Sequence, residues 1–173
     1  MRGAVGCELI DDGWRPIWVV CGMAVSERKC RFADVQYPSY DDVMREPDIR
    51  TDGWCLENGE AYHRAAPETF CIPERLSREA LQPGDLVKLI FRISIDDPDE
   101  PEAVERMWVL VRERIKGGGY LGILDNDPYA VAENDEFWSG IELPFWPHHI
   151  IDIQQRDENT LSLACEEPKR RWL

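Results

Sequence analysis

Runs of apolar residues in the second half of the chain predict β-strands. Residues 85–93 and 106–115 are rich in β-branched and aromatic side chains, and shorter apolar runs follow at 120–124 and 146–153. Turns that contain glycine or proline separate these runs. Strands at this spacing indicate a strongly bent antiparallel sheet or a small, partly open barrel.

The first half alternates short apolar runs with polar breaks. Two short helices are expected here, over residues 40–45 after Ser39 and over 74–81. Strands are expected over 17–25, 29–35 and 51–60, the last of them ending in an Asn58-Gly59 turn. Near the C-terminus, one more strand is expected over 161–165. The fold class is therefore α+β, dominated by the bent sheet. We expect two parts, a β-rich N-terminal lobe with short helices over 1–80 and a β domain over 81–173.

Net charge narrows the classes of partner. The formal charge of −14 counts against nucleic acid and against an anionic membrane surface, because both are bound through lysine and arginine. Seven tryptophans exclude a solvated acidic disordered chain. The longest apolar run, 17–25, is far shorter than the ~20 residues that cross a bilayer, and no apolar leader of the secretory type is present. These features predict a cytoplasmic protein.

The six cysteines, none in a C-x-x-C pair, are then expected to be reduced and structural. Neither their spacing nor any other motif indicates a metal or a cofactor, so none is expected. Gly117-Gly118-Gly119 precedes an apolar β-like run and no helix, which indicates a turn with positive φ angles and not a phosphate loop.

Two motifs carry oxygen or nitrogen ligands close together in the sequence. Asp125-Asn126-Asp127-Pro128 resembles the start of a calcium loop, but its proline and the surrounding strands favour a tight turn in which Asp125 or Asn126 bonds its own backbone. His148-His149 would point to opposite faces of a regular strand, so the pair is not expected to bind one metal. A small metal-dependent hydrolase that uses Asp125, Asp127 and one of these histidines remains an alternative.

Charge is distributed unevenly around the last strands. No lysine or arginine occurs between Gly117 and Gln155, a stretch that contains seven acidic residues and six large aromatic residues. Aromatic side chains framed by carboxylates are typical of surfaces that recognise a basic protein, although buried rings with solubilising acids would give the same pattern. The candidate partner-binding residues are Asp135, Glu136, Trp138, Glu142 and Trp146.

Residues from about 81 to 153 resemble a bacterial domain-of-unknown-function family, number twenty-three-fourteen. The similarity rests on five motifs, which are GDLVKLIF at 84–91, ERMWV at 105–109, GGYLG at 118–122, LDNDP at 124–128 and HHIID at 148–152. It implies a β-rich domain without an assigned activity, and residues 137–146 look like an insertion in the family pattern.

Asp52-Gly53-Trp54 with Gly59-Glu60 also resembles elements of immunity proteins that neutralise bacterial toxins. We therefore expect a non-enzymatic binding protein, an immunity protein that occludes a basic toxin. Besides the hydrolase, a housekeeping structural or regulatory domain is the second alternative to this function. The sequence indicates no oligomeric state.

Overall fold

A computed structural model of the protein describes residues 44–172, all of which belong to one compact unit. Six strands, four short α-helices and one 3-10 turn make up this part of the chain. In chain order they are α1 (Ile49–Asp52), β1 (Trp54–Leu56), α2 (Gly59–Ala65), α3 (Arg75–Glu79), β2 (Leu86–Ser94), β3 (Glu102–Arg114), β4 (Tyr120–Leu124), β5 (Glu142–Phe145), η1 (Pro147–His149), β6 (Ile150–Gln154) and α4 (Glu158–Leu163).

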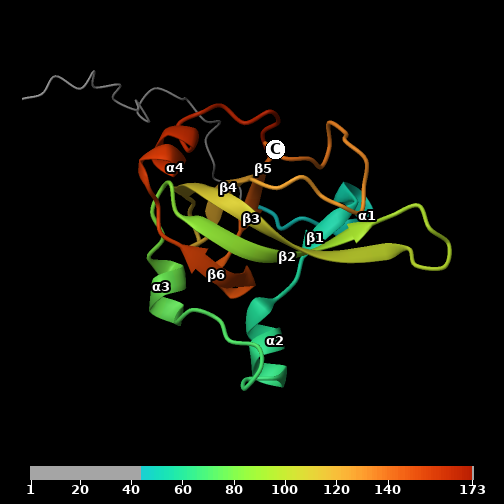
Figure 1. Ribbon diagram of the computed structural model, residues 1–173, viewed down its shortest axis with the longest axis horizontal. Coiled ribbons are helices and arrows are strands. Elements are labelled where there is room, and N and C mark those ends of the chain that lie inside the picture. Colours follow the sequence, from blue (N-terminus) through green and yellow to red (C-terminus); the bar gives the residue numbers. More distant parts are fainter. Residues whose placement is uncertain (1–43, 173) are drawn as a thin grey trace, which may run out of the picture. The chain divides into compact units, whose positions relative to one another are not determined.

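The strands form one antiparallel sheet in the order β1-β2-β3-β4-β5, with β6 paired to β2. β3 lies along one edge of β2, and the other edge is shared by β6, at Leu86 to Leu89, and β1, at Phe91 to Ile93. The sheet is curled into a half-barrel (Figure 1). The predicted fold class, an α+β protein dominated by a bent antiparallel sheet, is confirmed.

The main core lies inside the curl of the sheet and is strongly aromatic. Trp54 of β1 is 2% exposed, stacks on Phe137 with ring centroids 5.0 Å apart, and also contacts Phe91 and Trp172. Tyr120 and Phe145 stack similarly further along, at 5.4 Å. Rings from β1, β2, β4, β5 and a loop therefore close one core, and burying each such side chain contributes ~1.5–3 kcal/mol.

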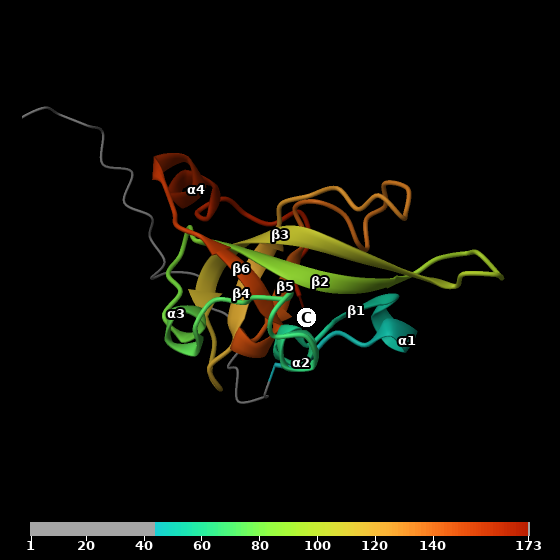
Figure 2. The same ribbon diagram turned by 60° about the horizontal axis from the view of Figure 1, so that its bottom comes forward.

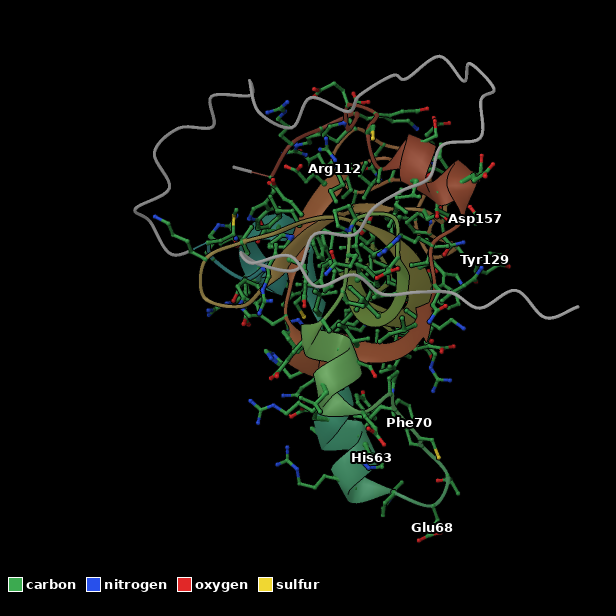
Figure 3. The ribbon with its side chains drawn as sticks, turned by 90° about the vertical axis from the view of Figure 1, so that its left-hand side faces the viewer. His63, Glu68, Phe70, Arg112, Tyr129 and Asp157 are labelled. Carbon is green, nitrogen blue, oxygen red and sulfur yellow. The ribbon has the colours of Figure 1, made fainter. Side chains whose placement is uncertain are left out.

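A register shift in β3 matters for the interior. The pairing of β3 with β4 shifts between Val111 and Glu113, which marks a β-bulge at Arg112. A bulge changes the direction in which a side chain points and increases the local twist. Figure 3 shows Arg112 at the end of the fold near α4, away from the end formed by α2, where His63 and Phe70 lie.

Several local predictions hold. The strands at β2, β3 and β4 lie where the apolar runs placed them, and a helix occupies 75–79 within the expected 74–81. The Gly117-Gly118 turn before β4 has the expected positive φ angles, +87° and +84°.

Two local predictions are wrong, and one strand was not predicted. Asn58-Gly59 is not a hairpin turn, because the Asn58 side chain caps α2 by accepting from the Ala61 N–H. Residues 158–163 form helix α4 and not a strand, because Asp157 and Thr160 close a capping box at its start. The short strand β5 was not predicted. The strands and the helix expected within 1–43 lie outside the described residues, apart from the last two helix positions, which are not helical.

The boundary expected between residues 80 and 81 does not separate two lobes in the described part. β1 pairs with β2 across this boundary, with Trp54 opposite Ile93, and both residues belong to the same core. In residues 44–80 the structure has three short helices and a single three-residue strand. A single sheet therefore joins the described N-terminal residues to the rest.

Cysteine chemistry differs from the expectation in one place. Cys55 and Cys71 are free thiols, as predicted, whereas Cys165 is disulfide-bonded. The prediction of reduced cysteines is therefore wrong for Cys165, and Cys7, Cys21 and Cys30 lie outside the described residues. Within the described residues, no helix has the length and apolar character needed to span a membrane.

Candidate functional site

A hollow of about 420 Å³ opens beside the loop between β4 and β5. Three of the five residues predicted to bind a partner, Asp135, Glu136 and Trp138, line this hollow. Its other lining residues are Glu133, Asn134, Ser139, Ile141, Lys169 and Arg170. The volume falls within the range of sites that hold a small ligand or a side chain.

Asn134 shapes the loop that lines the hollow. Its side-chain oxygen accepts from the N–H groups of Glu136 and Phe137, and its amide nitrogen donates to the Ala132 carbonyl. These bonds hold the backbone of residues 132–137 in a tight turn. The carboxylates on either side of Asn134 are therefore displayed on a structured loop.

Neighbouring aromatic residues of this loop have different roles. Phe137 is 5% exposed and stacks on Trp54 in the core. For this ring the alternative given above, a buried aromatic side chain and not a binding surface, is the correct one. Trp138 is half-buried and lines the hollow, where part of its ring system is accessible to a partner. The core contact of Phe137 anchors the loop and so positions Trp138 beside the hollow.

The C-terminal tail supplies positive charge that the sequence reasoning missed. The Lys169 N–H donates to the Gly140 carbonyl, and the Glu142 N–H donates to the Arg170 carbonyl. Residues 169 and 170 thus lie along the loop and line the hollow with their side chains. The absence of lysine and arginine between Gly117 and Gln155 is therefore local to the sequence, because the folded site contains both signs of charge.

Glu142 lies inside the protein and not on a partner-binding surface. All four residues of β5 are buried, and Glu142 is 3% exposed. Its Oε1 lies 2.9 Å from Nη1 of Arg112, and its Oε2 accepts from the Trp172 N–H at 3.2 Å. A buried carboxylate requires such partners, so its expected role in partner binding is corrected to a structural one.

The charge of Glu142 also acts on a neighbour. Glu113 lies beside this pair on β3, and its pKa is raised, first by burial and then by the negative charge of Glu142.

Trp146 lies outside the hollow. Its indole packs on Gly119, where a Cβ atom would come within 2.9 Å of the ring, and it meets His149 edge-on at 6.1 Å. Gly119 is thus needed for a close approach and not for a phosphate. The structure places Trp146 in a packing contact apart from Asp135, Glu136 and Trp138.

The acidic β2–β3 hairpin and the β4–β5 loop extend on the same side of the described unit (Figure 2). The β2–β3 hairpin ends in exposed Asp96, Asp97, Asp99 and Glu100. The carboxylate of Glu105 on β3 accepts from the N–H groups of Tyr129 and Ala130, which fixes the second loop beside β3. Tyr129, at 96% exposure, is the most exposed large hydrophobic side chain in the described residues.

The Asp125-Asn126-Asp127-Pro128 segment is irregular, with a bend at Asn126, and it is not the self-bonded tight turn that was expected. The Asn126 side chain accepts from the Trp108 N–H of β3 at 2.6 Å and does not bond its own turn. Asp125 and Asp127 are exposed, and among the described residues neither belongs to a group that could hold a metal ion. The Asp125, Asp127 and His148 constellation of the hydrolase alternative is therefore not assembled.

The histidine pair is arranged differently from the expectation. His148 and His149 lie in the 3-10 turn η1 and not in a strand, so their rings are adjacent, with centroids 4.0 Å apart. Together with Glu46 they offer ligand atoms within 4.8 Å of one another. Arg78 holds this turn by donating to the Pro147 carbonyl while it pairs with Glu60 at 2.8 Å.

The protonation of His149 argues against a metal at this cluster. Its Nδ1 accepts from the Trp146 N–H at 3.1 Å, so in the neutral ring the proton is on Nε2 and no lone pair remains for a metal. Metal-binding histidines instead donate from their second nitrogen. Burial, together with the charge of His148, lowers the pKa of His149 to about 3. The ring is therefore a neutral hydrogen-bonding group at physiological pH.

Calorimetric titration with Ca²⁺, Mg²⁺ and Zn²⁺ tests both motifs. We expect Asp125→Asn and His148→Gln to leave each titration unchanged, because neither segment offers a complete set of free ligands. Binding tighter than about 10⁻⁴ M, the weak end of calcium sites, that either substitution abolishes would contradict this expectation and support the hydrolase alternative.

Comparison with known proteins adds no relative. No family model matches the chain, and no curated protein or solved structure shows significant similarity to it.

Proposed function

We propose that the protein is a non-enzymatic binding protein. It binds a basic protein partner at the acidic surface formed by residues 95–101, 125–127 and 133–139. The observation that carries this proposal is a hollow lined by acidic residues of the β4–β5 loop and by a half-buried tryptophan, with the acidic β2–β3 hairpin extending on the same side as this loop (Figure 2). Among the described residues, Glu133, Asp135 and Glu136 form no ion pair, so their charge is available to a partner.

The proposed partner class follows from electrostatics. A field of one sign accelerates the association of an oppositely charged protein, and a few desolvated anchors slow its dissociation. An immunity protein that occupies the basic cleft of a toxin is one form of this function, to which the resemblances of the sequence point. The identity of the partner distinguishes an immunity protein from a protein that forms a different regulatory complex.

The experiment begins with affinity capture from the native host on the immobilised chain, identification of the captured proteins and purification of the main one. We expect a basic partner whose association slows when Asp99→Lys and Glu100→Lys are combined. Glu158→Lys with Glu166→Lys makes the same charge change near α4 and serves as the matched control. An acidic partner, or equal losses for both double variants, would contradict the proposal.

Single substitutions at the loop separate the two kinetic steps. Trp138→Ala should cost roughly 2 kcal/mol or more of affinity through faster dissociation, with little change in melting temperature. Glu136→Lys should instead slow association, most clearly at low salt. Surface plasmon resonance against the purified partner measures both effects, and unfolding of Trp138→Ala would show that the ring is structural.

A further inference from the structure

The hollow combines three kinds of side chain that together define a ligand. Glu133, Glu136 and Trp138 line it from the loop, and Lys169 and Arg170 line it from the tail. It is therefore a cavity with an aromatic wall and both signs of charge, and not merely a group of acids. A cationic ligand would have to gain more from the carboxylates and the tryptophan than it loses by repulsion from the tail.

The tail cations are held in place largely by backbone contacts. Arg170 forms an isolated β-bridge with Ile141. The aliphatic part of the Lys169 side chain packs closely on Gly140, where a Cβ atom would come within 2.9 Å of it. The Arg170 guanidinium donates to the Asp135 carbonyl at 3.4 Å and leaves the Asp135 carboxylate unpaired among the described residues. Among the described residues, no ion pair therefore joins the loop carboxylates to the cations of the tail.

From this geometry we infer that the hollow binds an arginine side chain of the partner. The inference rests on the proposed function and specifies the group that enters the site. A guanidinium group forms paired hydrogen bonds with carboxylates and also stacks on tryptophan, whereas an ammonium group offers only a point charge. One cation in the hollow therefore uses both the loop carboxylates and Trp138.

The probe is a capped glycine–serine peptide with a single arginine, titrated into ¹⁵N-labelled full-length protein. The indole N–H signal of Trp138, assigned with Trp138→Phe, reports occupancy of the hollow. We expect saturable shifts with a millimolar dissociation constant. The same peptide with citrulline, which keeps the shape but not the charge, should bind at least tenfold more weakly, and the lysine peptide should fall between the two.

Variants identify the residues responsible. Glu133→Gln with Glu136→Gln should weaken the arginine peptide at least fivefold, while Asp99→Asn with Glu100→Gln, an equal charge change on the hairpin, should leave it unchanged. Equal binding of arginine and citrulline, or no effect of the loop variant, would overturn the inference.

The two proposals fail in distinguishable ways. If a basic partner binds at the hairpin while the arginine peptide does not shift Trp138, the inference falls and the proposed function stands. If the peptide binds as described but the captured partner is acidic, the proposed function falls. Spectra that retain the dispersed indole signals confirm that every variant is folded.

Discussion

Replacing Glu142 with alanine should lower the free energy of unfolding by about 3–5 kcal/mol, because it leaves the guanidinium of Arg112 buried without its carboxylate. Arg112 is 7% exposed, and its Nε already donates to the Ala164 carbonyl at 3.3 Å. The substitution also removes the acceptor of the Trp172 N–H. Urea denaturation followed by circular dichroism measures the loss.

Two further variants establish the cause. Glu136→Ala removes an exposed carboxylate and should change stability by no more than ~0.5 kcal/mol. Arg112→Met combined with Glu142→Leu replaces both charges with apolar side chains and should recover much of the stability that Glu142→Ala loses. If Glu142→Ala instead weakens partner binding at unchanged stability, the prediction of Glu142 as a binding residue would be correct.

The strands that the sequence predicted best are those with long apolar runs. β2 and β3 form the centre of the sheet, so continuous β-branched and aromatic residues identify them without knowledge of their partners. β5 was missed because it is four residues long and contains Glu142 and Pro144, which look polar or strand-breaking in isolation. Its burial depends on Arg112, thirty residues earlier in the chain.

The starts of α2 and α4 are set by side-chain caps and contacts that the sequence pattern did not indicate. Leu161-Ser162-Leu163 alternates like a strand, but the capping box of Asp157 and Thr160 begins a helix just before it. Asn58-Gly59 has the composition of a hairpin turn, yet Gly59 packs where a Cβ atom would come within 2.6 Å of Ile151. In both cases a contact or a cap outside the pattern determined the structure.

Part of the candidate site was predictable because charge is a local property of the sequence. Asp135, Glu136 and Trp138 are close neighbours in one loop, and the sequence placed them together without a structure. Lys169 and Arg170 were missed because backbone contacts of the tail with Gly140, Ile141 and Glu142, which the sequence does not reveal, bring them to that loop. The adjacency of the His148 and His149 rings does not follow from the apolar run at 146–153, which predicts a strand where the chain forms a 3-10 turn.

Acidification should destabilise the protein through His149. The pKa of His149 is lowered from 6.5 to about 3 by burial, so between these values the unfolded chain binds a proton that the native ring does not. The free energy of unfolding then falls as pH falls, by up to about 1.4 kcal/mol per pH unit within this window. The loss should amount to about 2 kcal/mol at pH 5.

Two carboxyl groups also change the free energy of unfolding with pH, one in a lower pH range and the other with the opposite sign. The pKa of Asp52 is lowered to about 2 by its hydrogen bond with Arg45, so its contribution is lost only below pH 3.8. The raised pKa of Glu113 has the opposite sign, because the native state then binds more protons than the unfolded chain above pH 4.5. Comparing the wild type with a variant at His149 between pH 4.5 and 6.5 cancels both contributions.

His149→Asn is the informative variant, because the asparagine side-chain oxygen can accept from the Trp146 N–H in place of Nδ1 but cannot titrate in this range. Between pH 4.5 and 6.5, the slope of its free energy of unfolding against pH should be smaller than that of the wild type by the equivalent of about one proton. A slope that His149→Asn leaves unchanged would mean that the native ring is protonated. The Trp146 N–H would then face a second donor at Nδ1, and η1 could not have the arrangement described.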